Sequence, residues 1–234
     1  MTSVPEKEQA FDLLGLDLDD GVLALAELER DPVFHKIDPG NYAYYLSRSL
    51  AMGREAAERL HGQDIRVLLE QAGIQFHLAA SAGTGTFKVA LRAQLDWGGK
   101  VPQITVYRES LRQLQAAAET VDGLGPVSFD RIVDIHLAHE YYHFLEYRSG
   151  RFTNELLDPV EALRIGPFRR QATILQTSEI AAHAFCKELL GLPLLPSLLD
   201  HVYLMQTGAI KKEQFAENVK KWKAILGENG LRML

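Results

Sequence analysis

The segment Ile135–Tyr147, IHLAHEYYHFLEY, places three histidines and two glutamates among thirteen residues that are otherwise apolar or aromatic. It contains the pattern HExxH, formed by His139, Glu140 and His143. On a helix, residues four apart lie on one face, so both imidazoles can reach the same metal ion. Glu140 lies one residue round from His139, where its carboxylate can reach a metal-bound water. This arrangement is typical of zinc hydrolases that use a glutamate as general base.

The pattern lies inside a predicted helix, which the metal chemistry requires. Ser128 and Asp130 are both suitable helix starts, and Gly150 is a suitable helix end. The alternative is a helix whose polar residues simply face water. Neighbouring apolar residues such as Phe144 and Leu145 leave little room for a wholly hydrated face, and this favours the metal site.

A catalytic zinc site needs a third protein ligand, and a later helix offers one. Glu179 lies in the segment TSEIAAHAF, beside small alanines that allow close helix packing. A carboxylate placed on such an apolar helix needs a partner, because an unpaired buried charge is costly. Zinc accepts two imidazoles and one carboxylate. We therefore predict one Zn²⁺ per chain, held by His139, His143 and Glu179.

Three other acids are weaker candidates for the third ligand. Glu146 follows His143 by three residues but would have to reach back along its own helix. We expect it to be a surface acid or to support a ligand by hydrogen bonding. Glu155 and Asp158 lie in the irregular segment after this helix and are weaker still.

The two candidate ligand segments resemble a known family. LAHEYYHFLEY followed by SEIAAHAFCKELLGLP is similar to the ImmA/IrrE zinc metallopeptidases, which pair an AHELGH-like helix with an ExxANxFAxxLLxP-like helix. The resemblance covers roughly Arg54 to Pro193. It implies a minimal, zincin-like (gluzincin-like) peptidase fold, with the same three metal ligands and with Glu140 as the base. The family often works beside DNA-binding regulators and cuts a repressor, so the resemblance also implies a protein substrate, such as a regulator of this kind.

This chain departs from the family pattern at two places. Tyr141 and Tyr142 replace the usual Leu-Gly between the glutamate and the second histidine, and His183 replaces the usual asparagine. Neither change removes a ligand, but both can alter the substrate groove. The first forty and the last forty residues have no obvious counterpart, and no helix-turn-helix is evident.

Other side chains near the two helices have open roles. His183 lies one turn after Glu179, so it can donate a hydrogen bond to a ligand, stabilise an oxyanion, or simply pack in the core. His136 can line the site but is expected to cap the helix or face solvent. Tyr142 and Tyr147 can supply an oxyanion donor, although tyrosines on such helices usually pack.

The remaining sequence predicts helices on both sides of a short β section. Helices are expected over 42–70 with a break near Gly62, and over 108–121, 128–150, 167–191 and 211–230. Alternating apolar and polar residues predict strands over 74–79, 87–96 and 103–107, while 151–166 is expected to be irregular. The predicted class is α+β, with helices around a small, mainly antiparallel sheet.

This pattern divides the chain into three parts. We predict an N-terminal extension over 1–40, a metallopeptidase-like domain over 41–200, and a C-terminal helical extension over 201–234 that packs on the same domain. The sheet edge near Gln103–Tyr107 is expected to be exposed, where an extended peptide could pair by strand addition.

Composition limits the function classes. The chain has 234 residues and a formal net charge of −6, so direct nucleic-acid binding is not expected, although a local basic face remains possible. Its single cysteine, Cys186, excludes an intrachain disulfide and is expected to be a small buried residue. The acidic N-terminal segment lacks the features of a secretory signal, and no apolar run is long enough for a membrane. A cytoplasmic location is expected, and the oligomeric state is left open.

These features predict a zinc-dependent peptidase that hydrolyses a bond in a peptide or protein substrate. The main alternative keeps the fold without turnover, as a metallopeptidase-like module that binds a partner. A purely structural metal, or no metal, is a third hypothesis.

Overall fold

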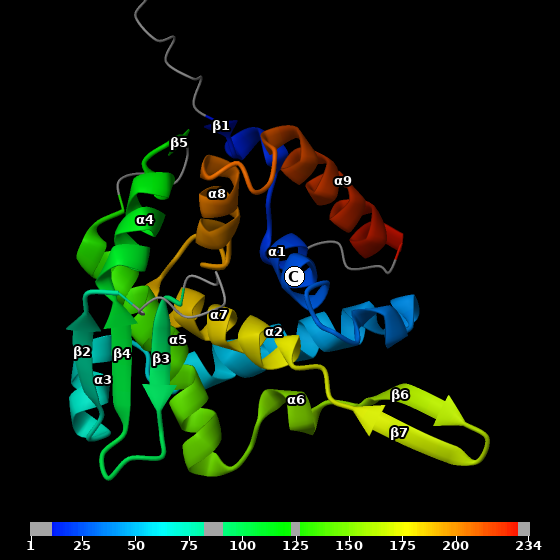
Figure 1. Cartoon of the computed structure of the whole chain (residues 1–234), viewed down its shortest axis with the longest axis horizontal. Helices are drawn as coiled ribbons and strands as arrows, with labels where there is room; N and C mark the ends of the chain where they lie inside the picture. Colours follow the sequence, from blue (N-terminus) through cyan, green and yellow to red (C-terminus); the bar gives the residue numbers. More distant parts are fainter. Residues whose placement is uncertain (1–10, 82–90, 123–126, 229–234) are drawn as a thin grey trace, which may run out of the picture.

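The computed structural model describes residues 11–81, 91–122 and 127–228, and Figure 1 shows their arrangement. These residues form nine α-helices, a three-stranded sheet, a two-stranded hairpin and one short parallel strand pair. The helices are α1 (Asp20–Leu28), α2 (Tyr42–Glu58), α3 (Ile65–Gln71), α4 (Arg108–Ala118), α5 (Phe129–Ser149), α6 (Thr153–Leu156), α7 (Gln176–Leu190), α8 (Leu198–Gln206) and α9 (Lys212–Glu228). The 3-10 helices are η1 (Leu14–Leu16), η2 (Phe34–Lys36) and η3 (Pro39–Asn41). The strands are β1 (Phe11–Asp12), β2 (Gln75–Ala79), β3 (Ala93–Asp96), β4 (Gln103–Tyr107), β5 (Val121–Asp122), β6 (Val160–Ile165) and β7 (Phe168–Ala172). The predicted α+β class is confirmed.

Several helix ends lie where the sequence predicts them. The Ser128 side chain accepts a hydrogen bond from the backbone N–H of Arg131 at 3.1 Å and caps the start of α5. At the other end of α5, Gly150 adopts a φ of 64°, and Gly191 ends α7 with a φ of 62°. Both values lie in the left-handed region that glycine enters at little cost. The break between α2 and α3 falls around Gly62, as predicted.

The prediction of a mainly antiparallel sheet is wrong, because the sheet is mixed. Its order is β2-β4-β3, with β2 parallel to β4 and β3 antiparallel to β4. β4 is therefore the central strand, so the predicted exposed edge at Gln103–Tyr107 is also wrong. β3 and β4 pair as a hairpin, and β2 occupies the far side of β4. Apolar alternation marks each strand, but it carries no information on which strand lies in the middle.

The sheet packs one face on the helices. Ile104 and Val106 of β4 are fully buried in the same cluster as Ile132 and Ile135 of α5. The strand expected over 87–96 is observed only over Ala93–Asp96, and positions 87–90 lie outside the described residues. The sheet thus supports the helix that carries the HExxH pattern.

The helix predicted over 167–191 is wrong in its first part. Phe168–Ala172 forms β7, which pairs antiparallel with β6, and α7 begins only at Gln176. Gly166 has a φ of 57° and makes a tight turn with Pro167, so Pro167 serves a hairpin rather than a helix start. The segment 151–166, predicted to be irregular, contains α6 and β6. Figure 1 shows this hairpin projecting from the helical body.

Two hydrophobic clusters form the core, and α7 contributes to both. The first combines residues of α1, α2, α7, α8 and α9, and the second combines residues of α3, β4, α4, α5 and α7. All nine residues of α1 are buried, although the sequence did not identify this helix or α8. On α7, Ile180 and Ala184 belong to the first cluster, and Ala181, Ala182 and Phe185 belong to the second. Such two-sided burial fixes α7 firmly in place.

Among the helices in the described ranges, none combines the length and the apolar character needed to cross a lipid bilayer.

Candidate metal centre

The two histidines of the HExxH pattern lie on one face of α5, as predicted. Their Nε2 atoms are 3.2 Å apart, and their rings meet edge-on with centroids 4.9 Å apart. Their side chains are 17% and 18% exposed, so the ring edges remain accessible. Two imidazole nitrogens this close together form half of a metal site.

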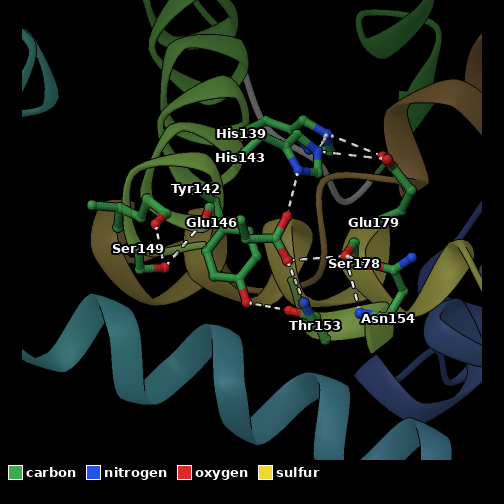
Figure 2. A network of polar contacts seen from close by, with 10 residues as sticks. His139, Tyr142, His143, Glu146, Ser149, Thr153, Asn154, Ser178 and Glu179 are labelled. Atoms are coloured by element: carbon green, nitrogen blue, oxygen red, sulfur yellow. Dashed lines mark hydrogen bonds and ion pairs between the residues drawn. The ribbon is translucent and has the colours of Figure 1, made fainter. Parts of the chain in front are cut away.

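Glu179 completes the group from the first turn of α7. Its Oε2 atom lies 3.1 Å from Nε2 of His139, and its Oε1 atom lies 3.5 Å from Nε2 of His143. Figure 2 shows the carboxylate facing both rings. His139, His143 and Glu179 are a group that could hold a metal ion, because one ligand atom from each lies within 4.8 Å of the others. The structure therefore brings together the three residues that the sequence selected.

The separations match those expected around zinc. Ligand atoms about 2.0–2.2 Å from a tetrahedral ion lie about 3.3–3.6 Å from each other. The three contacts of 3.1, 3.2 and 3.5 Å are close to this range, with the two carboxylate contacts made by different oxygen atoms of Glu179. Because Glu179 is 39% exposed, the outer side of the group is open to solvent. Two imidazoles and one carboxylate are also a donor set that zinc accepts in catalytic sites.

The charges of the group favour a bound cation. Burial opposes ionisation of Glu179, but hydrogen bonds from His139 and His143 outweigh it and hold its pKa well below the usual range. Burial likewise tends to lower the pKa of His143, but its contacts with Glu146 and Glu179 raise that pKa to about 10. Two carboxylates thus stabilise positive charge at this position, and a metal ion can supply that charge.

Glu146 holds the His143 ring through a hydrogen bond to Nδ1, the ring nitrogen that does not face the other triad members. The sequence only partly indicates this role. Its side chain is 5% exposed, and its Oε2 atom accepts a hydrogen bond from Nδ1 of His143 at 3.0 Å. Its Oε1 atom accepts from the backbone N–H of Thr153 at 2.7 Å and from the hydroxyl of Ser178 at 2.9 Å. Figure 2 shows this carboxylate between the histidine and α6. Because Glu146 holds the proton on Nδ1, Nε2 is the nitrogen that would coordinate a metal ion in place of its own proton.

Of the two expectations for Glu146, the buried supporting acid is observed and the surface acid is not. The rivals Glu155 and Asp158 are exposed and do not belong to the group around His139. The i, i+3 spacing from His143 was the available signal for Glu146. Its other partner, the backbone of Thr153, depends on how the chain turns after Gly150, and no spacing rule predicts that turn.

Glu140 and His183 line a cleft that two members of the triad, His139 and Glu179, also line. This cleft has a volume of about 730 Å³. The His183 ring lies 4.9 Å from the His139 ring, and its Nδ1 atom is buried without a hydrogen-bond partner among the described residues. Burial holds the pKa of His183 well below its usual value, so the imidazole is neutral. Either a packing role or contact with substrate is compatible with this position.

His136 lines the cleft rather than capping the helix or facing bulk solvent, which corrects the expectation for this residue. Its Nδ1–H donates to the backbone carbonyl of Ile132 at 2.8 Å. Burial lowers its pKa to about 4, so this imidazole is also neutral. A neutral ring with Nδ1 protonated presents Nε2 as a hydrogen-bond acceptor.

Neither tyrosine is placed to stabilise an oxyanion. The Tyr142 hydroxyl is paired with the Thr153 hydroxyl at 2.7 Å and is buried away from the cleft. Tyr147 stacks on Trp97 with ring centroids 6.0 Å apart and does not line the cleft. The buried thiol of Cys186 contacts the carbonyl of Ile135, and burial raises its pKa, as expected for a small core residue.

The wall facing the triad comes from parts of the chain that the sequence did not connect with the site. α1 contributes Glu27, the turn after α1 contributes Arg30, and α8 contributes Asp200 and Tyr203. Arg92, just before β3, lies 4.5 Å above the Tyr203 ring and 3.4 Å from the Asp200 carboxylate. No signal in the sequence pairs these segments, because each contact joins residues that are far apart along the chain.

Comparisons with known proteins add no further assignment: no protein-family model, no curated protein and no solved structure matches the chain. The likeness to the ImmA/IrrE metallopeptidases therefore depends on the two helix motifs and on the triad that they form.

Proposed function

We propose that the chain is a zinc-dependent peptidase whose metal is held by His139, His143 and Glu179. The observation that carries this proposal is the convergence of two Nε2 atoms and one carboxylate from two helices. The open cleft beside them, with Glu140 in its lining, supports a catalytic site rather than a closed structural one. The rest of the chemistry follows from the residues around this cleft.

Glu140 is the general base in this proposal. When bound, zinc would polarise the substrate carbonyl and lower the pKa of a coordinated water. Glu140 would then take a proton from the attacking water and pass it to the leaving amine. The carboxylate is half-buried and lies in the same lining as His139 and Glu179, where a reacting water must also lie.

The proposed substrate is an extended segment of a peptide or protein. A cleft of about 730 Å³ accommodates several side chains, and its wall includes residues 91–93 at the start of β3. In the described part of the chain, β3 pairs only with β4, so its other edge faces outward. An extended substrate can pair with such an edge through its backbone, while side chains enter the cleft.

Metal content is the first test. We expect wild-type protein purified without chelator to contain about one zinc per chain, and Glu179→Gln to contain much less, as measured by plasma mass spectrometry. Glu70→Gln is a matched control, because Glu70 is exposed on α3. Equal zinc in the Glu179 variant and the wild type would contradict the ligand assignment.

Turnover is the second test. We expect zinc-loaded protein to cleave at least one pool of a fluorescence-quenched peptide library. Glu140→Gln should keep its metal and lower kcat/KM by about 10²–10⁴-fold, the usual contribution of a general base. A wild-type protein that binds zinc but cleaves none of the pools would favour the partner-binding alternative. Equal cleavage by the Glu140 variant would remove Glu140 from the reaction.

A further inference from the structure

A second cleft lies on another face of α5 and shares no lining residue with the first. It has a volume of about 790 Å³ and is formed by α2, the C-terminal half of α5 and the chain around α6. Glu146, which supports His143, is part of its inner wall. The proposed chemistry does not use this space.

Four arginines surround this cleft. Arg48 and Arg59 belong to α2, Arg148 belongs to α5, and Arg151 follows Gly150. All four are exposed, and none forms an ion pair within the described residues. Concentrated positive charge of this kind is unexpected on a chain whose net charge is −6. It indicates a surface that binds a negatively charged partner.

The acids of the lining do not neutralise these arginines. Glu55 is exposed, and Glu146 is buried and already bonded to His143, Thr153 and Ser178. The four guanidinium groups therefore remain available. Each can bind a carboxylate through two parallel hydrogen bonds.

The floor of the cleft is apolar and offers no stacking surface for nucleic-acid bases. Leu60, Leu145 and Leu156 line it together with Met52. Tyr142 is the one aromatic residue of the lining, and it is buried with its hydroxyl bonded to Thr153. Single-stranded nucleic acid usually requires exposed aromatic rings, whereas apolar side chains of a peptide can pack on leucines.

We propose that this cleft binds an acidic, amphipathic peptide segment of a partner protein. The carboxylates of that segment pair with the four arginines, and its apolar side chains cover the leucine floor. Charge complementarity selects this occupant over a basic peptide. The apolar floor selects it over a nucleic acid. The inference stands independently of the proposed peptidase activity, because it uses no residue of the triad.

A direct binding measurement tests this proposal. The probe is a fluorescein-labelled peptide of repeated Glu-Glu-Leu-Leu blocks, followed by fluorescence anisotropy. We expect Arg48→Glu/Arg148→Glu to weaken binding by about tenfold or more, and added salt to weaken binding to the wild type. Arg164→Glu/Arg170→Glu is a matched control with two exposed arginines of the β6–β7 hairpin, and its affinity should equal that of the wild type.

Further variants and probes distinguish an acidic peptide from other ligands of this cleft. Leu156→Asp changes the floor without touching an arginine, and it should also weaken binding of the acidic probe. Failure of the wild type to bind the probe, or equal affinity in the cleft and hairpin variants, would overturn the proposal. Tighter binding of a single-stranded oligonucleotide of equal charge would assign the cleft to nucleic acid instead. A wild-type dimer that the arginine double variant abolishes in sedimentation experiments would assign it to a second copy of the chain.

Discussion

At the scale of single residues, the metal site depends on the orientation of His143 as much as on its presence. Glu146 accepts the Nδ1 proton of this ring and is itself held by the Thr153 backbone and the Ser178 hydroxyl. The supporting carboxylate is therefore fixed from three sides. These contacts already fix the His143 ring with Nε2 towards Glu179. Metal binding therefore costs the ring little further rotational freedom.

Glu146→Gln should weaken zinc binding although it removes no ligand. If the amide oxygen keeps the bonds from Thr153 and Ser178, the amide NH₂ faces Nδ1 of His143, and the ring must move its proton to Nε2. Loss of such a partner typically costs about 10–100-fold in metal affinity. Competition with a chromophoric chelator measures this change.

Glu155→Gln is the control for that measurement, because Glu155 is an exposed acid on the neighbouring α6. Its affinity should match that of the wild type. Should both variants bind zinc equally tightly, Glu146 would be only a structural acid.

The residues that the sequence could identify are those whose roles depend on local spacing. His139 and His143 share a helix face by the i, i+4 rule, and Glu179 was conspicuous as an acid among alanines. The prediction for His136 was wrong because the face of α5 that borders the cleft extends beyond the residues of the HExxH pattern. Glu27, Arg30 and Arg92 could not be identified, because they reach the cleft only through long-range packing.

At the scale of secondary-structure elements, the position of Glu179 depends on very close packing between α2 and α7. A Cβ atom added at Gly53 of α2 would lie 2.1 Å from the backbone carbonyl oxygen of Ala181 and 2.9 Å from the Cβ of Ala184. A backbone carbonyl within a helix cannot move aside as a flexible side chain can. Only glycine at position 53 therefore allows α7 to lie where it does.

Gly53→Ala should destabilise the protein and displace α7. Forced overpacking usually costs about 1–3 kcal/mol, which should appear as a lower midpoint in urea unfolding. Because Ala181 is two residues from Glu179, we also expect weaker zinc binding in this variant.

The control is Gly227→Ala in α9, where an added Cβ meets nothing within 4 Å. Alanine is the better helix former, so this variant should gain up to about 1 kcal/mol. If both substitutions changed stability in the same direction, the steric explanation for Gly53 would be wrong.

Elements with strong local signals were predicted correctly, and those defined by pairing were not. α5 has a serine cap and a terminal glycine, and both ends are where the sequence indicates. β7 was mistaken for the start of α7, because Pro167 favours a helix start and a turn equally well, and only the pairing with β6 decides between them. The order β2-β4-β3 likewise depends on contacts between distant segments.

At the scale of the whole molecule, buried histidines make stability depend on pH. His201 of α8 packs against the rings of Phe215 and Trp222 in α9. Burial lowers its pKa to about 4, with Asp200 acting to raise it and Arg30 to lower it. The ordinary value is 6.5, so the unfolded chain binds a proton in this interval and the folded chain does not. Stability is therefore retained above pH 6.5 and lost as the pH falls towards 4.

His201→Leu should make this loss of stability shallower. One proton contributes about 1.4 kcal/mol per pH unit to the free energy of unfolding, and the variant no longer binds it. Urea unfolding at several pH values between about 4 and 7 measures this slope. These pH values span the interval between the His201 pKa of about 4 in the folded protein and its ordinary value of 6.5.

His61→Leu is the matched control, because His61 is an exposed residue outside both hydrophobic clusters. Its slope should equal that of the wild type. An unchanged slope in the His201 variant would mean that this ring is protonated in the folded protein.

The complete burial of α1 has a consequence for how the protein is made. Its neighbours include α9, where Trp222 donates a hydrogen bond to Glu29, just after α1. α1 also packs on α2 and α7, but the part of its cover that α9 supplies lies almost two hundred residues further along the chain. During synthesis, α1 therefore lacks part of its cover until α9 has been made. We expect the first hydrophobic cluster to close only after α9 has left the ribosome, because α9 contributes residues to that cluster.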